Sequence, residues 1–135
     1  MTKKKKHIDT YETPYDVHIV IANEAVTLED LRKKYKYCDN NELDDDFTGS
    51  IATTARCEDK VTGRKVVLVK YNRPSLVKDV DKKLDFINTI SHEALHVALD
   101  IYAYIGQDVD VNDNESLAYL VGWIGECIYK TWTKK

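Results

Sequence analysis

Residues 91–106, with the sequence SHEALHVALDIYAYIG, decide the fold, because they place an HExxH motif inside a segment with helical periodicity. Residues four apart lie one above the other on the same face of a helix. His92 and His96 can therefore bind one metal ion, and Glu93 lies close enough to act on a water molecule beside it. The alternative is a helix that carries two partly buried histidines and one solvated glutamate. The motif favours a metal site.

The rest of the pattern predicts an α+β domain with a small antiparallel sheet. Three strands are expected, at residues 17–21, 50–57 and 65–71. Three helices are expected, at residues 27–37, 79–105 and 114–130. Thr27 is the expected N-cap of the first helix, Gly63 supplies a hairpin turn, and Gly106 ends the second helix. We expect residues 1–16 to be a disordered tail and residues 17–135 to form one domain.

Composition limits the classes of partner. The chain has 135 residues, of which 43% are hydrophobic and 32% charged, as in soluble globular proteins. Its net charge of −3 gives no reason to expect nucleic acid as a partner, and the one dense basic run is Lys3 to Lys6. No apolar run is long enough to predict a membrane span. Three widely spaced cysteines fit reduced thiols, which predicts a cytoplasmic protein.

A catalytic zinc site needs a third protein ligand beside the two histidines. Glu115, nineteen residues after His96, opens the following helix and is the predicted ligand. Small residues on its face, Ala118 and Gly122, would let this helix approach the histidines closely. Alternatively, Glu115 belongs to a capping box with Asn112 as the N-cap. The ligand interpretation is favoured, because the cap leaves the two histidines without a third partner.

Two further polar residues lie one turn away from the histidines. Asp100 follows His96, and Asn88 precedes His92. Either side chain could hydrogen-bond a metal-bound histidine. Asp100 is also a weak candidate for a fourth ligand, although a solvated or supporting group is the simpler interpretation.

With these residues, the chain resembles the gluzincins, zinc peptidases whose third ligand is a glutamate on the next helix. The sequences SHEALHVALDIYAYIG and NESLAYLVGWI also resemble small HExxH proteins encoded by tailed bacteriophages, commonly described as zinc peptidases. The resemblance covers residues 91–125 and implies a minimal zincin-like fold. It departs from larger gluzincins at Tyr119, where those enzymes often have an aspartate. No oxyanion-supporting residue is identifiable among the candidates Tyr71, Tyr102 and Tyr119.

The expected function is hydrolysis of a peptide bond. Zn²⁺ would be bound by His92, His96 and Glu115, with water in the fourth position and Glu93 as general base. A peptide or protein substrate could pair with an exposed sheet edge, for which residues 65–71 are the candidate. Two alternatives are a zinc-stabilised structural or interaction module without turnover, and a processing peptidase selective for one protein.

Overall fold

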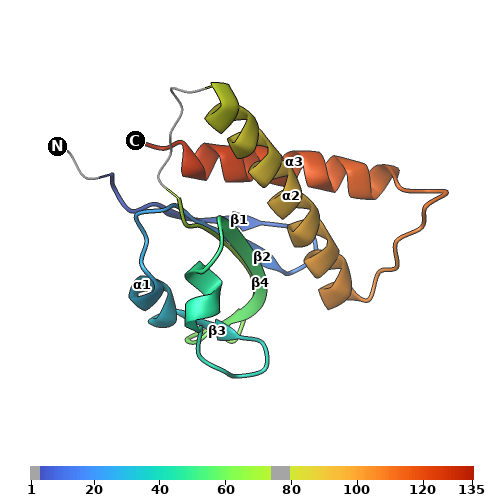
Figure 1. Cartoon of the computed structure of the whole chain (residues 1–135). Coiled ribbons are helices and arrows are strands. Elements are labelled where there is room, and N and C mark those ends of the chain that lie inside the picture. Colours follow the sequence, from blue (N-terminus) through green and yellow to red (C-terminus); the bar gives the residue numbers. More distant parts are fainter. Residues whose placement is uncertain (1–3, 74–79) are drawn as a thin grey trace.

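The computed structural model describes residues 4–73 and 80–135, which form five strands, two long helices and two short helical segments (Figure 1). The strands are β1 (Ile8–Glu12), β2 (His18–Ala22), β3 (Tyr35–Tyr37), β4 (Ala52–Asp59) and β5 (Lys65–Tyr71). The helices are α1 (Leu28–Arg32), the 3₁₀ segment η1 (Asp45–Thr48), α2 (Val80–Ile105) and α3 (Glu115–Trp132). Within the described residues, no helix is both long and apolar enough to cross a bilayer. The α+β class is confirmed, and the predicted helix start at residue 79 lies outside the described residues.

The sheet is mixed, whereas the sequence predicted an antiparallel one. Its strand order is β1-β2-β5-β4-β3, and the central pair β2–β5 is parallel. The remaining pairs are antiparallel. Strands buried on both faces have continuous apolar sequences, and this is the pattern of Ile19–Ala22 and Val66–Val69. The antiparallel β4–β5 hairpin is local, so the sequence predicts it, whereas the parallel β2–β5 pairing joins segments that lie far apart in the chain. The prediction of an antiparallel sheet was therefore wrong.

Part of the predicted disordered tail is a strand, which corrects that prediction. Residues 8–12 form β1, which pairs with β2 along its whole length. Asp9 and Tyr11 both contact the end of α3. The Tyr11 hydroxyl lies 2.9 Å from Thr131 Oγ1, and the Thr131 hydroxyl donates a hydrogen bond to Asp9 Oδ2 at 2.8 Å. Lys134 Nζ lies 2.6 Å from the same Asp9 oxygen. These contacts with residues more than 100 positions away in the chain hold residues 8–12 in place.

The first predicted helix is shorter than expected. Thr27 caps it through the predicted capping box with Asp30, which confirms the start of the helix. The helix ends at Arg32, however, and Tyr35–Tyr37 form strand β3 against β4. The alternation of Tyr, Lys and Tyr fits a strand edge, and Tyr35 is buried. Sheet pairing therefore replaces the last turn of the predicted helix.

Two apolar cores lie on the two faces of the sheet. On one face, β2 and β5 pack against α2 and α3, with Ile19, Val67, Val97, Ile101, Ile124, Ile128 and Trp132 fully buried. On the other face, the sheet packs against α1 and the segment around η1, with Leu31, Leu43, Phe47 and Leu68 fully buried. The molecule therefore has three layers, and both long helices lie on the same face of the sheet (Figure 1).

The two long helices cross near Gly125, not near the small residues that the sequence suggested. A Cβ atom at Gly125 would lie 3.9 Å from Ile90 Cγ2, whereas one at Gly122 would meet nothing within 4 Å. Ala118 is likewise exposed. The apolar face of α3 enters the core as predicted, while the face that carries Glu115 and Gly122 is open to solvent.

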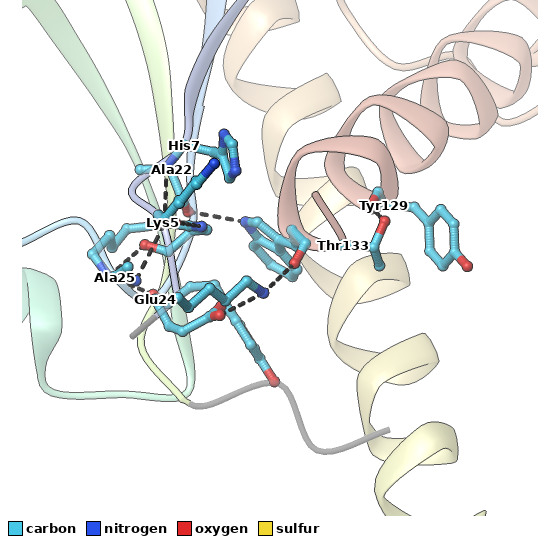
Figure 2. A network of polar contacts seen from close by, with 12 residues as sticks. Lys5, His7, Ala22, Glu24, Ala25, Tyr129 and Thr133 are labelled. Carbon is cyan, nitrogen blue, oxygen red and sulfur yellow. Dashed lines mark hydrogen bonds and ion pairs between the residues drawn. The ribbon is translucent and has the colours of Figure 1, made fainter. Parts of the chain in front are cut away.

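A polar network fastens the end of α3 to the loop after β2, and Figure 2 shows Ala22 and Glu24 beside the last turn of the helix, where Thr133 lies. Trp132 Nε1 donates to the carbonyl of Ala22 at 3.0 Å, and Lys4 Nζ lies 2.5 Å from Glu24 Oε1. Lys70 is buried and donates to the carbonyls of Asn23 and Tyr71. Burial lowers the pKa of Lys70 to about 8, against the opposing charge of Glu24. The network joins three parts of the chain at one end of the sheet.

The Asp9 contacts predict a loss of stability in acid. Burial alone would raise the pKa of Asp9, but the hydrogen bonds from Lys134 and Thr131 outweigh it and hold the pKa below the ordinary 3.8. A lowered carboxyl pKa stabilises the fold above the unfolded-state pKa, and that stabilisation disappears as the pH falls through the folded-state pKa. We expect Asp9→Asn to lower the free energy of unfolding at pH 7, with the difference from wild type shrinking as the pH falls through the lowered pKa of Asp9.

Urea unfolding at pH 7, 5 and 3 measures this difference. Asp16→Asn is the matched control, because Asp16 pairs with Arg64 at 2.6 Å on the surface with a side chain that is 90% exposed. Exposed ion pairs contribute little to the free energy of unfolding. If Asp9→Asn and wild type differ in free energy of unfolding by the same amount at pH 7 and pH 3, the lowered pKa of Asp9 is contradicted.

Candidate metal centre

The HExxH residues occupy the middle of α2 and converge as the motif predicts. His92 and His96 are both exposed, and their Nε2 atoms lie 3.1 Å apart. Their rings meet edge to face with centroids separated by 4.7 Å. Two imidazole nitrogens this close either share a hydrogen bond or direct their lone pairs at one cation.

The donor set fits a zinc ion. With Zn–N bonds of 2.0–2.1 Å and tetrahedral angles, two ligand nitrogens lie about 3.3–3.4 Å apart. The observed 3.1 Å needs only a small adjustment. One ligand atom from each of His92, Glu93 and His96 falls within a group whose members all lie within 4.8 Å of one another. Imidazole and carboxylate are ordinary zinc ligands, so these residues could bind the ion.

Glu93 lies on the sheet side of α2 and is only 4% exposed. Thr54 on β4 donates its hydroxyl to Glu93 Oε1 at 3.0 Å. The second oxygen, Oε2, lies 3.8 Å from His92 Nε2. A buried carboxylate is costly unless it accepts hydrogen bonds, and Thr54 provides one. Glu93 therefore has one oxygen bound to the sheet and one directed toward the histidines.

The structure does not bring Glu115 into this cluster. Glu115 is the first residue of α3 and is exposed, and the group formed by the histidines and Glu93 does not include it. The capping box with Asn112 does not form either, because Asn114 is the N-cap and its side chain makes no capping hydrogen bond. Glu115 thus has neither of the two roles weighed from the sequence in this conformation, and its role as a ligand stays a prediction.

Asp100, one turn after His96 on α2, contacts the sheet at β4. Its carboxylate lies 3.8 Å from Arg56 Nε on β4. Burial raises the pKa of Asp100, while the charges of Arg56 and His96 oppose that shift. Asp100 therefore pairs mainly with Arg56, rather than hydrogen-bonding to a histidine. Asn88 lies on the wall of a cleft beside His92.

That cleft has a volume of about 300 Å³ and opens next to the cluster. Its walls are the start of β4 and the turn of α2 before the motif, with Ser50, Ile51, Ala52, Asn88, Thr89, His92 and Glu93 lining it. Apart from the two motif residues, these side chains are uncharged. The cleft thus offers space for a neutral group directly beside Glu93.

The open sheet edge at the site belongs to β4, not to residues 65–71 as the sequence suggested. Strand β5 is internal, because it pairs with β2 on one side and β4 on the other. β3 covers only residues 57–59 of β4. The carbonyl of Arg56 accepts from Cys38 N on the outer side, so by alternation the N–H and C=O of Thr54 also face outward. Within residues 4–73 and 80–135, neither group of Thr54 has a backbone partner.

The three tyrosines considered as oxyanion supports lie in different environments. Tyr71 is buried and stacks on Trp132 with ring centroids 4.5 Å apart, so it belongs to the core. Tyr102 is 8% exposed and lines a separate cleft near Asp108 and Leu117. Tyr119 is 76% exposed on α3. None of them lines the cleft beside Glu93.

Thr54 and Arg56 are the site residues that the sequence did not reveal. Both lie on a strand about 40 positions before the residues that they contact, and nothing local marks them. Comparisons of the chain with protein-family models, with curated proteins and with solved structures give no match.

Proposed function

We propose that this chain is a zinc-dependent peptidase of the gluzincin type, with His92 and His96 as metal ligands and Glu93 as general base. The observation that carries the proposal is the convergence of the two Nε2 atoms, 3.1 Å apart, beside a buried glutamate. An HExxH helix that lies along a strand and is followed by a second helix also suits a minimal zincin-like fold. Glu115 is the proposed third ligand.

Ligation by Glu115 would require the first turn of α3 to move toward the histidines. The face of α3 that carries Glu115 is exposed, and a Cβ atom at Gly122 on this face would meet nothing within 4 Å. Residues 107–114 form a connection without helix or strand between α2 and α3. Such a segment can change conformation at a lower cost than the packed helix interface.

The chain's own residues have separate roles in the proposed reaction. Zn²⁺ held by His92, His96 and Glu115 would supply a Lewis acid and would lower the pKa of a bound water toward neutral pH. Glu93 Oε2, the oxygen on the histidine side, accepts a proton from the attacking water. Glu93 returns that proton to the leaving nitrogen as the C–N bond breaks. Thr54 holds the other oxygen of Glu93.

A peptide is the substrate class that this surface fits. The outward N–H and C=O of Thr54 can pair with an extended chain, as in strand addition. Such a chain would place one side chain in the 300 Å³ cleft beside Glu93. In the opposite direction along β4, the bound peptide would run toward Arg56 and Asp100, which form an ion pair at 3.8 Å.

The openness of the cluster favours a catalytic site over a structural one. Structural zinc sites are closed by four protein ligands, whereas catalytic sites keep a position open. The side chain of His92 is 66% exposed, and a cleft adjoins it. A zinc-stabilised module without turnover would not need either feature. A narrow choice of substrate, as in a processing peptidase, remains compatible with both features.

Metal content measured by elemental mass spectrometry tests the proposal. We expect about one zinc per wild-type chain, because the site has one pair of converging histidines. His96→Ala should lose it, and Glu115→Ala should bind zinc at least about 10-fold more weakly if Glu115 is the third ligand. His18→Ala is the matched control, because His18 lies on β2 outside the cluster.

The outcomes separate the parts of the proposal. Zinc retained at full affinity by Glu115→Ala would remove Glu115 from the ligand set and leave the histidine pair. A wild-type chain that binds no zinc, even when zinc is supplied, would defeat the peptidase proposal as a whole.

A further inference from the structure

One hydrogen bond joins the sheet to the motif helix inside the site. Thr54 Oγ1 lies 3.0 Å from Glu93 Oε1, and the two residues are 39 positions apart in the chain. In the described part of the chain, this is the only hydrogen bond that the Glu93 carboxylate accepts from outside α2. The glutamate is 4% exposed, so few water molecules can replace that donor.

We propose that Thr54 is a positioning residue for the reaction, which aims Glu93 by holding Oε1 and leaving Oε2 free to move the proton. This inference rests on the proposed peptidase function. A glutamate side chain has several rotatable bonds, and fixing one carboxylate oxygen selects a single orientation of the other. Oε2 then stays on the histidine side, 3.8 Å from His92 Nε2.

The same residue also sets the register of the substrate. The side chain of Thr54 faces α2, whereas its backbone N–H and C=O face outward from the edge of β4. A peptide that pairs with these two groups is therefore aligned with the residue that holds the base. Neighbouring positions cannot do both, because the backbone groups of Thr53 and Ala55 pair with β5 and their side chains lie on the opposite face.

Replacement of Thr54 by valine tests the hydroxyl with little change in shape. Hydrogen bonds to charged groups are strong enough that we expect kcat to fall roughly 10- to 100-fold. KM should change less than about threefold, since the outward backbone groups remain. Thr54→Ser restores a hydroxyl and should recover most of the loss. Thr53→Val is the matched control, because its side chain contacts Ser50 and not Glu93.

A second measurement does not depend on activity or on zinc. Free energies of unfolding of the metal-free wild type, Thr54→Val, Glu93→Ala and the double variant form a double-mutant cycle. A favourable coupling between the two positions, with no coupling between Thr53→Val and Glu93→Ala, is the result expected if the hydrogen bond exists. The zinc affinity of Thr54→Val should stay within about threefold of wild type, because the histidines are unchanged.

The two proposals fail in different ways. If the wild type hydrolyses peptides and Thr54→Val has an unchanged kcat, the positioning role is wrong and the peptidase function stands. Equal losses in Thr54→Val and Thr54→Ser would also overturn it, because the hydroxyl would then not be the cause. A wild type that binds no zinc, even when zinc is supplied, would overturn both proposals, whatever coupling the metal-free protein shows.

Discussion

Glu93→Gln is expected to lower peptide hydrolysis by roughly 10²- to 10⁴-fold, the usual contribution of a general base. The amide has nearly the same shape as the carboxylate, and its oxygen can still accept the hydrogen bond from Thr54. It cannot take up a proton from the attacking water, however. The zinc content of the variant should stay near that of wild type, because both histidines remain. Hydrolysis of a peptide library and elemental analysis of the same preparation measure the two effects.

Glu126→Gln provides the matched control, because Glu126 is exposed on α3 and is not a member of the cluster. Its activity should equal that of wild type. Full activity in Glu93→Gln would remove Glu93 from the mechanism and leave a site that only binds metal. Loss of zinc together with activity would instead make Glu93 a ligand, a role that its inclusion in the cluster permits.

The sequence predicted the helical half of the site because that half is local. The spacing of His92 and His96 corresponds to one helical turn, so the motif itself determines that their nitrogens converge, and the structure places them 3.1 Å apart. Gly106 ends α2 with φ +70°, a conformation that glycine adopts without strain. Both features depend on residues only a few positions apart.

The strand half of the site could not be predicted in the same way. Thr54 and Arg56 reach Glu93 and Asp100 only because β4 lies beside α2. β4 is held in the sheet by its pairing with β5, and β5 in turn pairs in parallel with β2, which brings together residues 48 positions apart, such as Ile19 and Val67. Register between distant strands is determined by burial on both faces, not by a local signal.

Glu115 illustrates the same limit within the helices. Counting residues placed it at the start of α3, and the structure agrees. Its position relative to the histidines depends on where the two helices cross. Periodicity identified the buried face of α3 but not the crossing point, which lies at Gly125 and Ile90 instead of at Ala118 and Gly122. The crossing leaves Glu115 exposed outside the cluster.

Trp132→Ala is expected to lower the free energy of unfolding by about 3–5 kcal/mol. Trp132 is fully buried at the end of α3 and stacks on Tyr71 with centroids 4.5 Å apart. Its indole also donates to the carbonyl of Ala22 at 3.0 Å, so truncation creates a cavity and leaves a buried acceptor without its donor. Urea unfolding followed by circular dichroism measures the change.

Two variants separate the contributions. Trp132→Phe keeps most of the aromatic volume but loses the indole N–H, and should cost about 1–3 kcal/mol. Trp123→Ala is the matched control on the same helix, because Trp123 is 37% exposed, and should cost less than Trp132→Ala. Equal losses at the two tryptophans would contradict the packing described here. Since Trp132 fastens α3 to β2 and β5, its truncation should destabilise the helix that carries Glu115 without altering a contact of His92, Glu93 or His96.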